Sequence, residues 1–131
     1  MINLLFAGNA GVFDGILTCM LSIFMRSKLD EPVTAYVFTM DVSRIKPSYT
    51  PVTDEQIRVL GAVAERFCPG SRVIKKDITQ LYEREFGGCP NEGAYCSPYT
   101  LLRLFADVAE IKAEKLLYLD ADIMFNRDIR L

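Results

Sequence analysis

The stretch from Leu116 to Phe125 constrains the fold more than any other part of the chain. Its first four residues, 116–119, are apolar and run directly into Asp120 and Asp122. A short apolar run of this kind is typical of a strand buried inside a parallel sheet, and we expect it to be the central strand. Ligands of open α/β sheets bind at the carboxyl ends of the strands, so both carboxylates are expected at a ligand site.

Asp120 and Asp122 are one residue apart and can turn toward a single hard cation. Mg²⁺ and Mn²⁺ take oxygen ligands and often share them with substrate phosphates. Burying two unpartnered carboxylates costs several kcal/mol, which favours a metal or phosphate site at this position. The alternative is a pair of solvated aspartates in an ordinary turn.

Apolar runs that predict strands alternate with amphipathic stretches that predict helices. The expected strands are residues 3–7, 33–40, 72–76 and 116–119. The expected helices are residues 14–27, a stretch from Thr53 to Pro69, residues 78–86, and a stretch that opens at Ser97. This alternation predicts an α/β fold with a doubly wound, mostly parallel sheet, as a single domain over residues 1–131.

Local signals predict where three of the helices begin. Asp14 is expected to cap the first helix, and Thr53 with Gln56 forms a capping box for the second. Ser97 is expected to cap the last helix, with Pro98 at its first position. The apolar face of that last helix is predicted to consist of Leu101, Leu104, Phe105 and Val108.

Composition excludes several classes of protein. The 131 residues carry a net charge of −2, which does not favour a nucleic-acid partner. No apolar run approaches the ~20 residues of a transmembrane helix, and no secretory signal is visible, so we expect a cytoplasmic protein. The chain has no His, and its four Cys lack metal-site or disulfide spacing, so reduced thiols are expected.

Two other enzyme classes compete for the same residues. Gly8, Gly11 and Gly15 lie between a strand and a helix, and Asp41 ends the second strand, as in an NAD-type dehydrogenase. The glycine spacing does not match the dinucleotide pattern, and glycines needed for turns with positive φ are an alternative explanation. A phosphatase of the haloacid dehalogenase type also uses Asp-x-Asp, but Met124 does not match that pattern.

Arg103 has two interpretations of equal weight. Its guanidinium could reach a diphosphate or a sugar. Asp107 follows four residues later on the expected helix, so a solvated ion pair would explain Arg103 equally well.

Three segments together resemble glycosyltransferase family 8, the family of glycogenin and of bacterial lipopolysaccharide galactosyl- and glucosyltransferases. They are residues 116–122 with 126–129, the arginine-bearing stretch 99–105, and the N-terminal segment 3–9. Their order along the chain is that of the family, and the resemblance covers nearly the whole chain. It implies the nucleotide-sugar transferase (GT-A-like) form of the α/β fold.

The resemblance implies a retaining hexosyltransferase that uses a UDP-sugar donor and Mn²⁺ or Mg²⁺. Asp120 and Asp122 would bind the metal, and Ala121 would lie between them at the donor. Ala7 and Asn9 would contact the nucleoside, and Arg103 would face the donor. The acceptor would be a glycan or a lipopolysaccharide. A non-catalytic nucleotide-binding or assembly fragment is the alternative, and a purely structural α/β domain is a third possibility.

The chain departs from the family pattern in three ways. Val12 stands where the family often has a base-stacking Tyr, and residues 109–112 lack the usual Pro. The third metal ligand of the family, a His, comes from a C-terminal half that the 131 residues do not include. We therefore expect a truncated, donor-binding portion whose exposed apolar surface could favour a homo-oligomer.

Overall fold

The computed structural model describes residues 1–130 and contains one sheet of four parallel strands. The strands are β1 (Ile2–Ala7), β2 (Val33–Thr39), β3 (Arg72–Asp77) and β4 (Leu117–Tyr118), in the order β3-β2-β1-β4. Leu5 of β1 is in register with Tyr36 on one side and with Tyr118 on the other. The parallel α/β architecture predicted from the sequence is confirmed.

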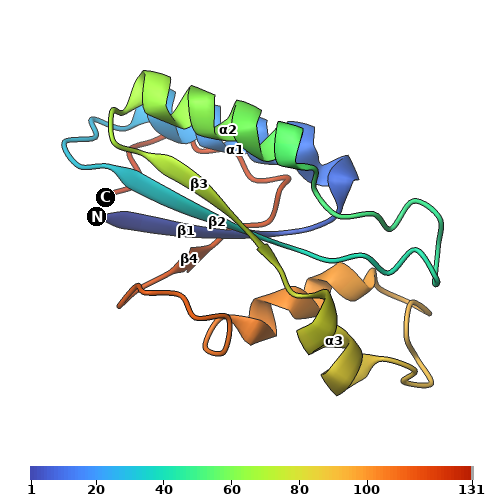
Figure 1. Cartoon of the computed structure of the whole chain (residues 1–131). Helices are drawn as coiled ribbons and strands as arrows, with labels where there is room; N and C mark the ends of the chain where they lie inside the picture. Colours follow the sequence, from blue (N-terminus) through green and yellow to red (C-terminus); the bar gives the residue numbers. More distant parts are fainter. Residues whose placement is uncertain (131) are drawn as a thin grey trace.

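Helices cover both faces of this sheet (Figure 1). On one face lie α1 (Phe13–Arg26) and α2 (Asp54–Phe67), and on the other lie α3 (Thr79–Phe86) and the 3₁₀ helix η2 (Pro98–Phe105). Successive residues of a strand point to opposite faces, so β1 contributes to two separate cores. Leu4 and Phe6 pack under α1 and α2, whereas Leu5 packs under α3 and η2.

The strand before the two aspartates is not the central strand, and this prediction is wrong. β4 has only two residues and lies at the edge of the described sheet, where Leu117 is 43% exposed. The fully buried strand is β2, all of whose seven residues are buried. The run is apolar although it lies at the edge because Leu119 packs into the core beneath α1, whereas Leu116 and Tyr118 pack against the core on the other face.

The capping box of Thr53 and Gln56 is confirmed at the start of α2. The prediction for α1 is wrong, because Asp14 lies inside its first turn and Val12 occupies the N-cap position. A short 3₁₀ helix, η1 (Ala10–Val12), precedes α1, and Asn9 caps it by accepting a hydrogen bond from the Gly11 N–H at 2.9 Å. The helical segment therefore begins at Ala10, in the 3₁₀ turn, and not after Asp14 as predicted.

Ser97 caps η2 as predicted, and Pro98 occupies its first turn. The predicted apolar face is wrong at two positions, since Leu104 and Val108 are 60% and 53% exposed. A 3₁₀ helix has three residues per turn, so residues three apart share a face. Tyr99, Leu102 and Phe105, which are three residues apart, are accordingly buried, together with Pro98 in the first turn.

The segment that follows β4 is hydrogen-bonded to α1 and to the residues just after it. The Phe125 N–H donates to Ser22 Oγ at 2.9 Å, and the Ile129 N–H donates to Ser27 Oγ at 3.0 Å. Asp128 accepts a hydrogen bond from the Lys28 N–H at 3.0 Å. These contacts hold the residues after Asp122 against the first face of the sheet. No helix in residues 1–130 is both long enough and apolar enough to cross a bilayer.

Candidate functional site

A cavity of about 190 Å³ opens at the carboxyl ends of β1 and β4. Its walls come from the turn after β1, from the start of η2, and from β4 with the residue that follows it. The lining residues are Ala7, Gly8, Asn9, Val12, Ser97, Tyr99, Thr100, Tyr118 and Asp120. Because parallel strands end at the same end of the sheet, β1 and β4 bring two segments that are far apart in the sequence together at this cavity.

The turn after β1 is held from several directions. Asn9 forms an antiparallel bridge with Pro51, and the Ala10 N–H donates to the Thr50 carbonyl at 3.0 Å. Gln56 donates from its side chain to the Ala10 carbonyl, also at 3.0 Å. The backbone of Ala7–Asn9 is thus fixed before any ligand binds.

Asp120 is an exposed carboxylate at the rim of the cavity. Its Oδ1 accepts a hydrogen bond from the Tyr118 hydroxyl at 2.7 Å, and its carbonyl accepts one from the Ile123 N–H at 3.2 Å. Burial, followed by the hydrogen bond to Asp120, raises the pKa of Tyr118 to about 12. The Tyr118 hydroxyl therefore keeps its proton at neutral pH and acts as the donor.

Gly15 allows the aspartate turn to lie directly on α1. A Cβ atom on Gly15 would overlap the backbone carbonyl of Ala121. Gly8, Gly11 and Gly15 do not have positive φ, so the turn explanation for these glycines is wrong. At Gly15 the reason for glycine is close contact with the residue between the two aspartates.

Arg103 lies on η2, and its guanidinium carbon is 5.5 Å from the centroid of the Tyr118 ring. The alternative ion pair with Asp107 is not formed, and within residues 1–130 no carboxylate lies within ion-pair distance of Arg103. η2 ends at Phe105, so Asp107 lies beyond the helix and does not follow Arg103 on one helical face. Arg103 is instead stacked next to the cavity.

The structure brings together Ala7, Asn9 and Asp120 in one cavity and stacks Arg103 beside it. Ala121 and Asp122 belong to the same turn, with Asp122 exposed, but neither lines the cavity. The sequence analysis missed Ser97, Tyr99, Thr100 and Tyr118. A signal existed for Tyr118, because a residue two positions before Asp120 on a strand points to the same side.

The possible metal ligands at this site are the two carboxylates Asp120 and Asp122, which are oxygen donors of the kind that hard cations take. Within residues 1–130, no group of three or more His, Cys, Asp or Glu side chains is gathered closely enough to hold a metal. Mg²⁺-like ions are often bound by one or two carboxylates, with phosphates and waters in the remaining positions. Asp120 and Asp122 are two carboxylates in the turn after β4 and do not form a complete protein cage.

The acid expected for the dehydrogenase alternative lies outside this cavity. Asp41 accepts hydrogen bonds from the backbone and the hydroxyl of Ser43 at 3.0 and 2.7 Å, and these lower its pKa. Its own N–H donates to Thr79 Oγ1 at 3.0 Å. Asp41 thus shapes a loop at the end of β2 and is not among the residues of the cavity.

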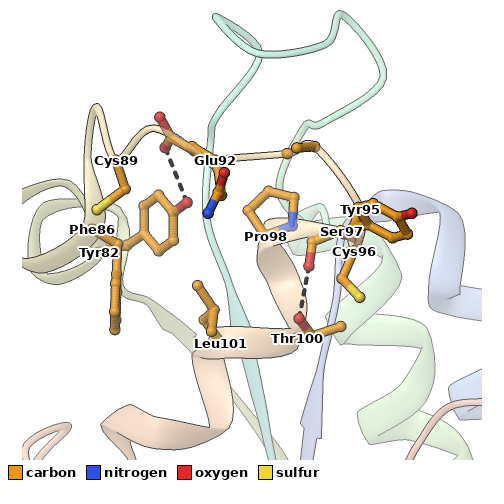
Figure 2. A pocket seen from close by; sticks show the side chains of 13 residues that line it. Tyr82, Phe86, Cys89, Glu92, Tyr95, Cys96, Ser97, Pro98, Thr100 and Leu101 are labelled. Atoms are coloured by element: carbon orange, nitrogen blue, oxygen red, sulfur yellow. Dashed lines mark hydrogen bonds between the residues drawn. The ribbon is translucent and has the colours of Figure 1, made fainter.

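A second cavity, of about 430 Å³, adjoins the first, and the two share Ser97 and Thr100 as lining residues. Figure 2 shows Tyr82 and Cys89 on one side of it and Tyr95 and Cys96 on the other. Cys89 and Cys96 are exposed free thiols, while Cys19 is buried in the core, where burial raises its pKa to about 11. The loop between α3 and η2 forms most of the wall of the second cavity.

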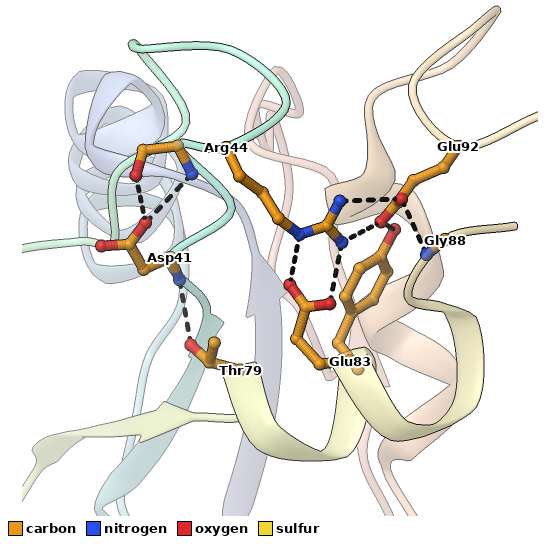
Figure 3. A network of polar contacts seen from close by, with 8 residues as sticks. Asp41, Arg44, Thr79, Glu83, Gly88 and Glu92 are labelled. Atoms are coloured by element: carbon orange, nitrogen blue, oxygen red, sulfur yellow. Dashed lines mark hydrogen bonds and ion pairs between the residues drawn. The ribbon is translucent and has the colours of Figure 1, made fainter.

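An ion-pair network holds the loop between α3 and η2 against the rest of the fold (Figure 3). Arg44 donates to Glu83 Oε1 at 2.8 Å and to Glu92 Oε2 at 2.9 Å. Glu92 also accepts from the Tyr82 hydroxyl and from the Gly88 N–H, both at 3.0 Å. The hydrogen bonds from Arg44 lower the pKa of Glu92 to about 2.

The model of glycosyl transferase family 8 matches residues 3–130 of the chain. Among solved structures, the chain is similar to two of LgtC, an active-site mutant and a galactosyltransferase complex with donor and acceptor sugar analogs, each at 16% identity and a TM-score of 0.71. It is also similar to apo mouse xyloside xylosyltransferase 1, at 16% identity and a TM-score of 0.56. No curated protein matches the chain.

Each of these alignments covers 98% of this chain but only 40%, 41% and 46% of the other chain, respectively. The chain therefore spans less than half the length of the solved structures it matches. At this identity the similarity shows the fold, and it supports the GT-A-like architecture expected from the sequence.

We expect Gly15→Ala to destabilise the protein by about 1–3 kcal/mol, because the added methyl group overlaps the Ala121 carbonyl. Gly61→Ala in α2 is the matched control, since a Cβ there meets no atom within 4 Å. The control should stabilise the helix by about 0.5–1 kcal/mol. Urea denaturation measures both variants, and equal effects of the same sign would contradict the proposed contact.

The lowered pKa of Glu92 predicts that the stability of the protein depends on pH. The pKa of Glu92 is lowered on folding, so its contribution is complete above the ordinary value of 4.5 and is lost as the pH falls toward about 2. Glu92→Gln should therefore lose stability relative to wild type at pH 6 and converge with it as the pH falls to 2. Urea denaturation across this range tests it, with the exposed Glu114→Gln as control. A constant difference between wild type and Glu92→Gln would show that ionisation of Glu92 is irrelevant.

Proposed function

Because the chain belongs to glycosyl transferase family 8, we propose that it binds the donor of a glycosyl transfer in the cavity at the ends of β1 and β4. The donor would be a nucleotide-diphosphate sugar of the UDP-hexose type. The observation that supports this proposal is that Ala7 and Asn9 line one cavity with Asp120, although they are far apart in the sequence. Residues 1–131 would act as a single nucleotide-sugar-binding domain.

The charge of the cavity supports dependence on a metal. Asp120 is the one charged side chain among the lining residues, and Arg103 lies beside the cavity and not among them, so a diphosphate entering alone would face a carboxylate at the lining. We propose that Asp120 and Asp122 hold Mn²⁺ or Mg²⁺, with the donor phosphates and water as further ligands. The ion would neutralise the charge that develops on the leaving diphosphate.

The other residues have separate roles in this proposal. The fixed backbone and side chain at Ala7 and Asn9 would contact the nucleoside, and Ala121 would place the two aspartates around the donor. Arg103 would offer its guanidinium to the diphosphate or the sugar beside the cavity. The sugar would pass to a hydroxyl of a glycan or lipopolysaccharide acceptor with retention of its anomeric configuration.

A nucleotide-binding role without turnover is the second candidate. It is favoured by the absence of a third metal-ligating side chain near Asp120 and Asp122 in the described part of the chain. Hexose release or transfer from UDP-glucose and UDP-galactose with Mn²⁺ distinguishes the two candidates. Turnover that depends on Asp120 would support the enzyme, and tight binding without turnover would support the second candidate.

Calorimetry with UDP in the presence and absence of Mn²⁺ tests donor binding. We expect Mn²⁺ to strengthen UDP binding, and Asp120→Asn to remove about tenfold or more of that gain, since even changes to outer-shell partners of metals cost ~10–100-fold. Asp107→Asn is the matched control, because Asp107 is exposed and outside the cavity. Equal binding by wild type and Asp120→Asn with Mn²⁺ would overturn the assignment of the cavity.

A further inference from the structure

Tyr118 touches two of the residues that the proposed function needs and has no role in that function so far. It lies on β4 in register with Leu5 of β1, two residues before Asp120. Its side chain lines the cavity and packs at the edge of the core formed under α3 and η2. The side chain thus stands between the sheet, the helical layer and the aspartate turn.

The hydroxyl of Tyr118 acts on Asp120. It donates to Oδ1 at 2.7 Å, which is a short hydrogen bond to an ionised acceptor and therefore a strong one. An exposed carboxylate at the start of a turn could otherwise rotate freely about its Cβ–Cγ bond. With Oδ1 engaged by the phenol, Oδ2 is the oxygen left to face a ligand.

The ring of Tyr118 acts on Arg103. A guanidinium within about 6 Å of an aromatic centroid is attracted to the ring face, and here the separation is 5.5 Å. Arg103 comes from η2, in the helical layer, whereas Asp120 follows β4 in the sheet. One side chain therefore contacts both the cationic and the anionic group, although they belong to different layers.

We propose that Tyr118 is a positioning residue that sets the place of Asp120 and Arg103 relative to each other at the donor site. This inference rests on the proposed function and deepens it. A metal held by Asp120 and a guanidinium stacked on Tyr118 would approach one diphosphate from two sides, so their spacing decides whether both can bind it. Small errors in such spacing are costly, since a misplacement of ~1 Å can cost ~10²-fold in rate.

A purely structural role makes a different prediction. If Tyr118 only fills space next to Leu5, phenylalanine would replace it without consequence for metal binding. If the hydroxyl orients Asp120, Tyr118→Phe keeps the ring and the packing but lets the carboxylate rotate. Hydrogen-bond partners of metal ligands typically contribute ~10–100-fold to metal affinity.

The first experiment titrates the full 131-residue chain with Mn²⁺ in the presence of UDP and follows free Mn²⁺ by its electron paramagnetic resonance signal. We expect Tyr118→Phe to bind Mn²⁺ ~10–100-fold more weakly than wild type, with its melting temperature little changed. Tyr82→Phe is the matched control, because it removes a phenol that donates to a different carboxylate, Glu92, at 3.0 Å. The control should bind Mn²⁺ as wild type does.

A double-mutant cycle tests the ring. In wild type, Arg103→Ala should weaken binding of UDP with Mn²⁺, whereas in a Tyr118→Leu background it should have a smaller effect, because the ring that places the guanidinium is gone. In a Tyr118→Phe background the full effect of Arg103→Ala should remain. Equal effects of Arg103→Ala in all three backgrounds would overturn the part of the proposal that concerns the ring.

The outcomes separate this inference from the proposed function. If wild type binds Mn²⁺ with UDP and Tyr118→Phe binds it equally well, the positioning role of the hydroxyl is wrong and the donor site stands. If wild type itself binds no Mn²⁺ in the presence of UDP, the donor site is wrong and the role of Tyr118 falls with it. Weakened binding in Tyr118→Phe but not in Tyr82→Phe supports both.

Discussion

The parallel pairing of β1 with β2 on one side and β4 on the other is the constraint on which the site depends. Because all three strands run in the same direction, the turn after β1 and the aspartates after β4 lie at the same end of the sheet, beyond the carboxyl ends of the strands. The burial of Leu4, Leu5 and Phe6 in cores on opposite faces keeps β1 in place between its neighbours. Asn9 and Asp120 therefore line one cavity although nearly the whole chain separates them.

The proposed donor site depends on the charge around that cavity. Asp120 makes the lining negative, and Arg103, the nearby cation, is held on the face of Tyr118 just beside it. A divalent cation would convert the carboxylate from a repulsive group into a binding group for phosphates. The first turn of α1 contacts the aspartate turn, because Gly15 lets the carbonyl of Ala121 lie against the helix.

The sequence predicted the order of strands and helices because periodicity and caps are local properties, and Thr53 with Gln56 shows how directly they can be read. It failed where tertiary contacts decide the outcome. The run before Asp120 has the composition of a central strand, yet within residues 1–130 β4 pairs with β1 alone and lies at the edge of the sheet. Leu104 was misplaced because the choice of a 3₁₀ helix over an α-helix changes which residues share a face, and Val108 was misplaced because η2 ends at Phe105. Within the site, Ala7, Asn9, Asp120 and Arg103 could be chosen by resemblance, but the contacts of Tyr118 depend on two layers of the fold and required the structure.

The most direct measurement of the central claim is the broadening of backbone amide signals by Mn²⁺ in a nitrogen-15 correlation spectrum recorded with UDP. Broadening by a paramagnetic ion is confined to amides close to it. The account predicts that amides of residues 8–11 and 118–123 broaden first, while those of residues 70–73, at the opposite end of the sheet, stay sharp. Broadening centred elsewhere, or none when UDP is present, would contradict the placement of a metal-dependent donor site at the ends of β1 and β4.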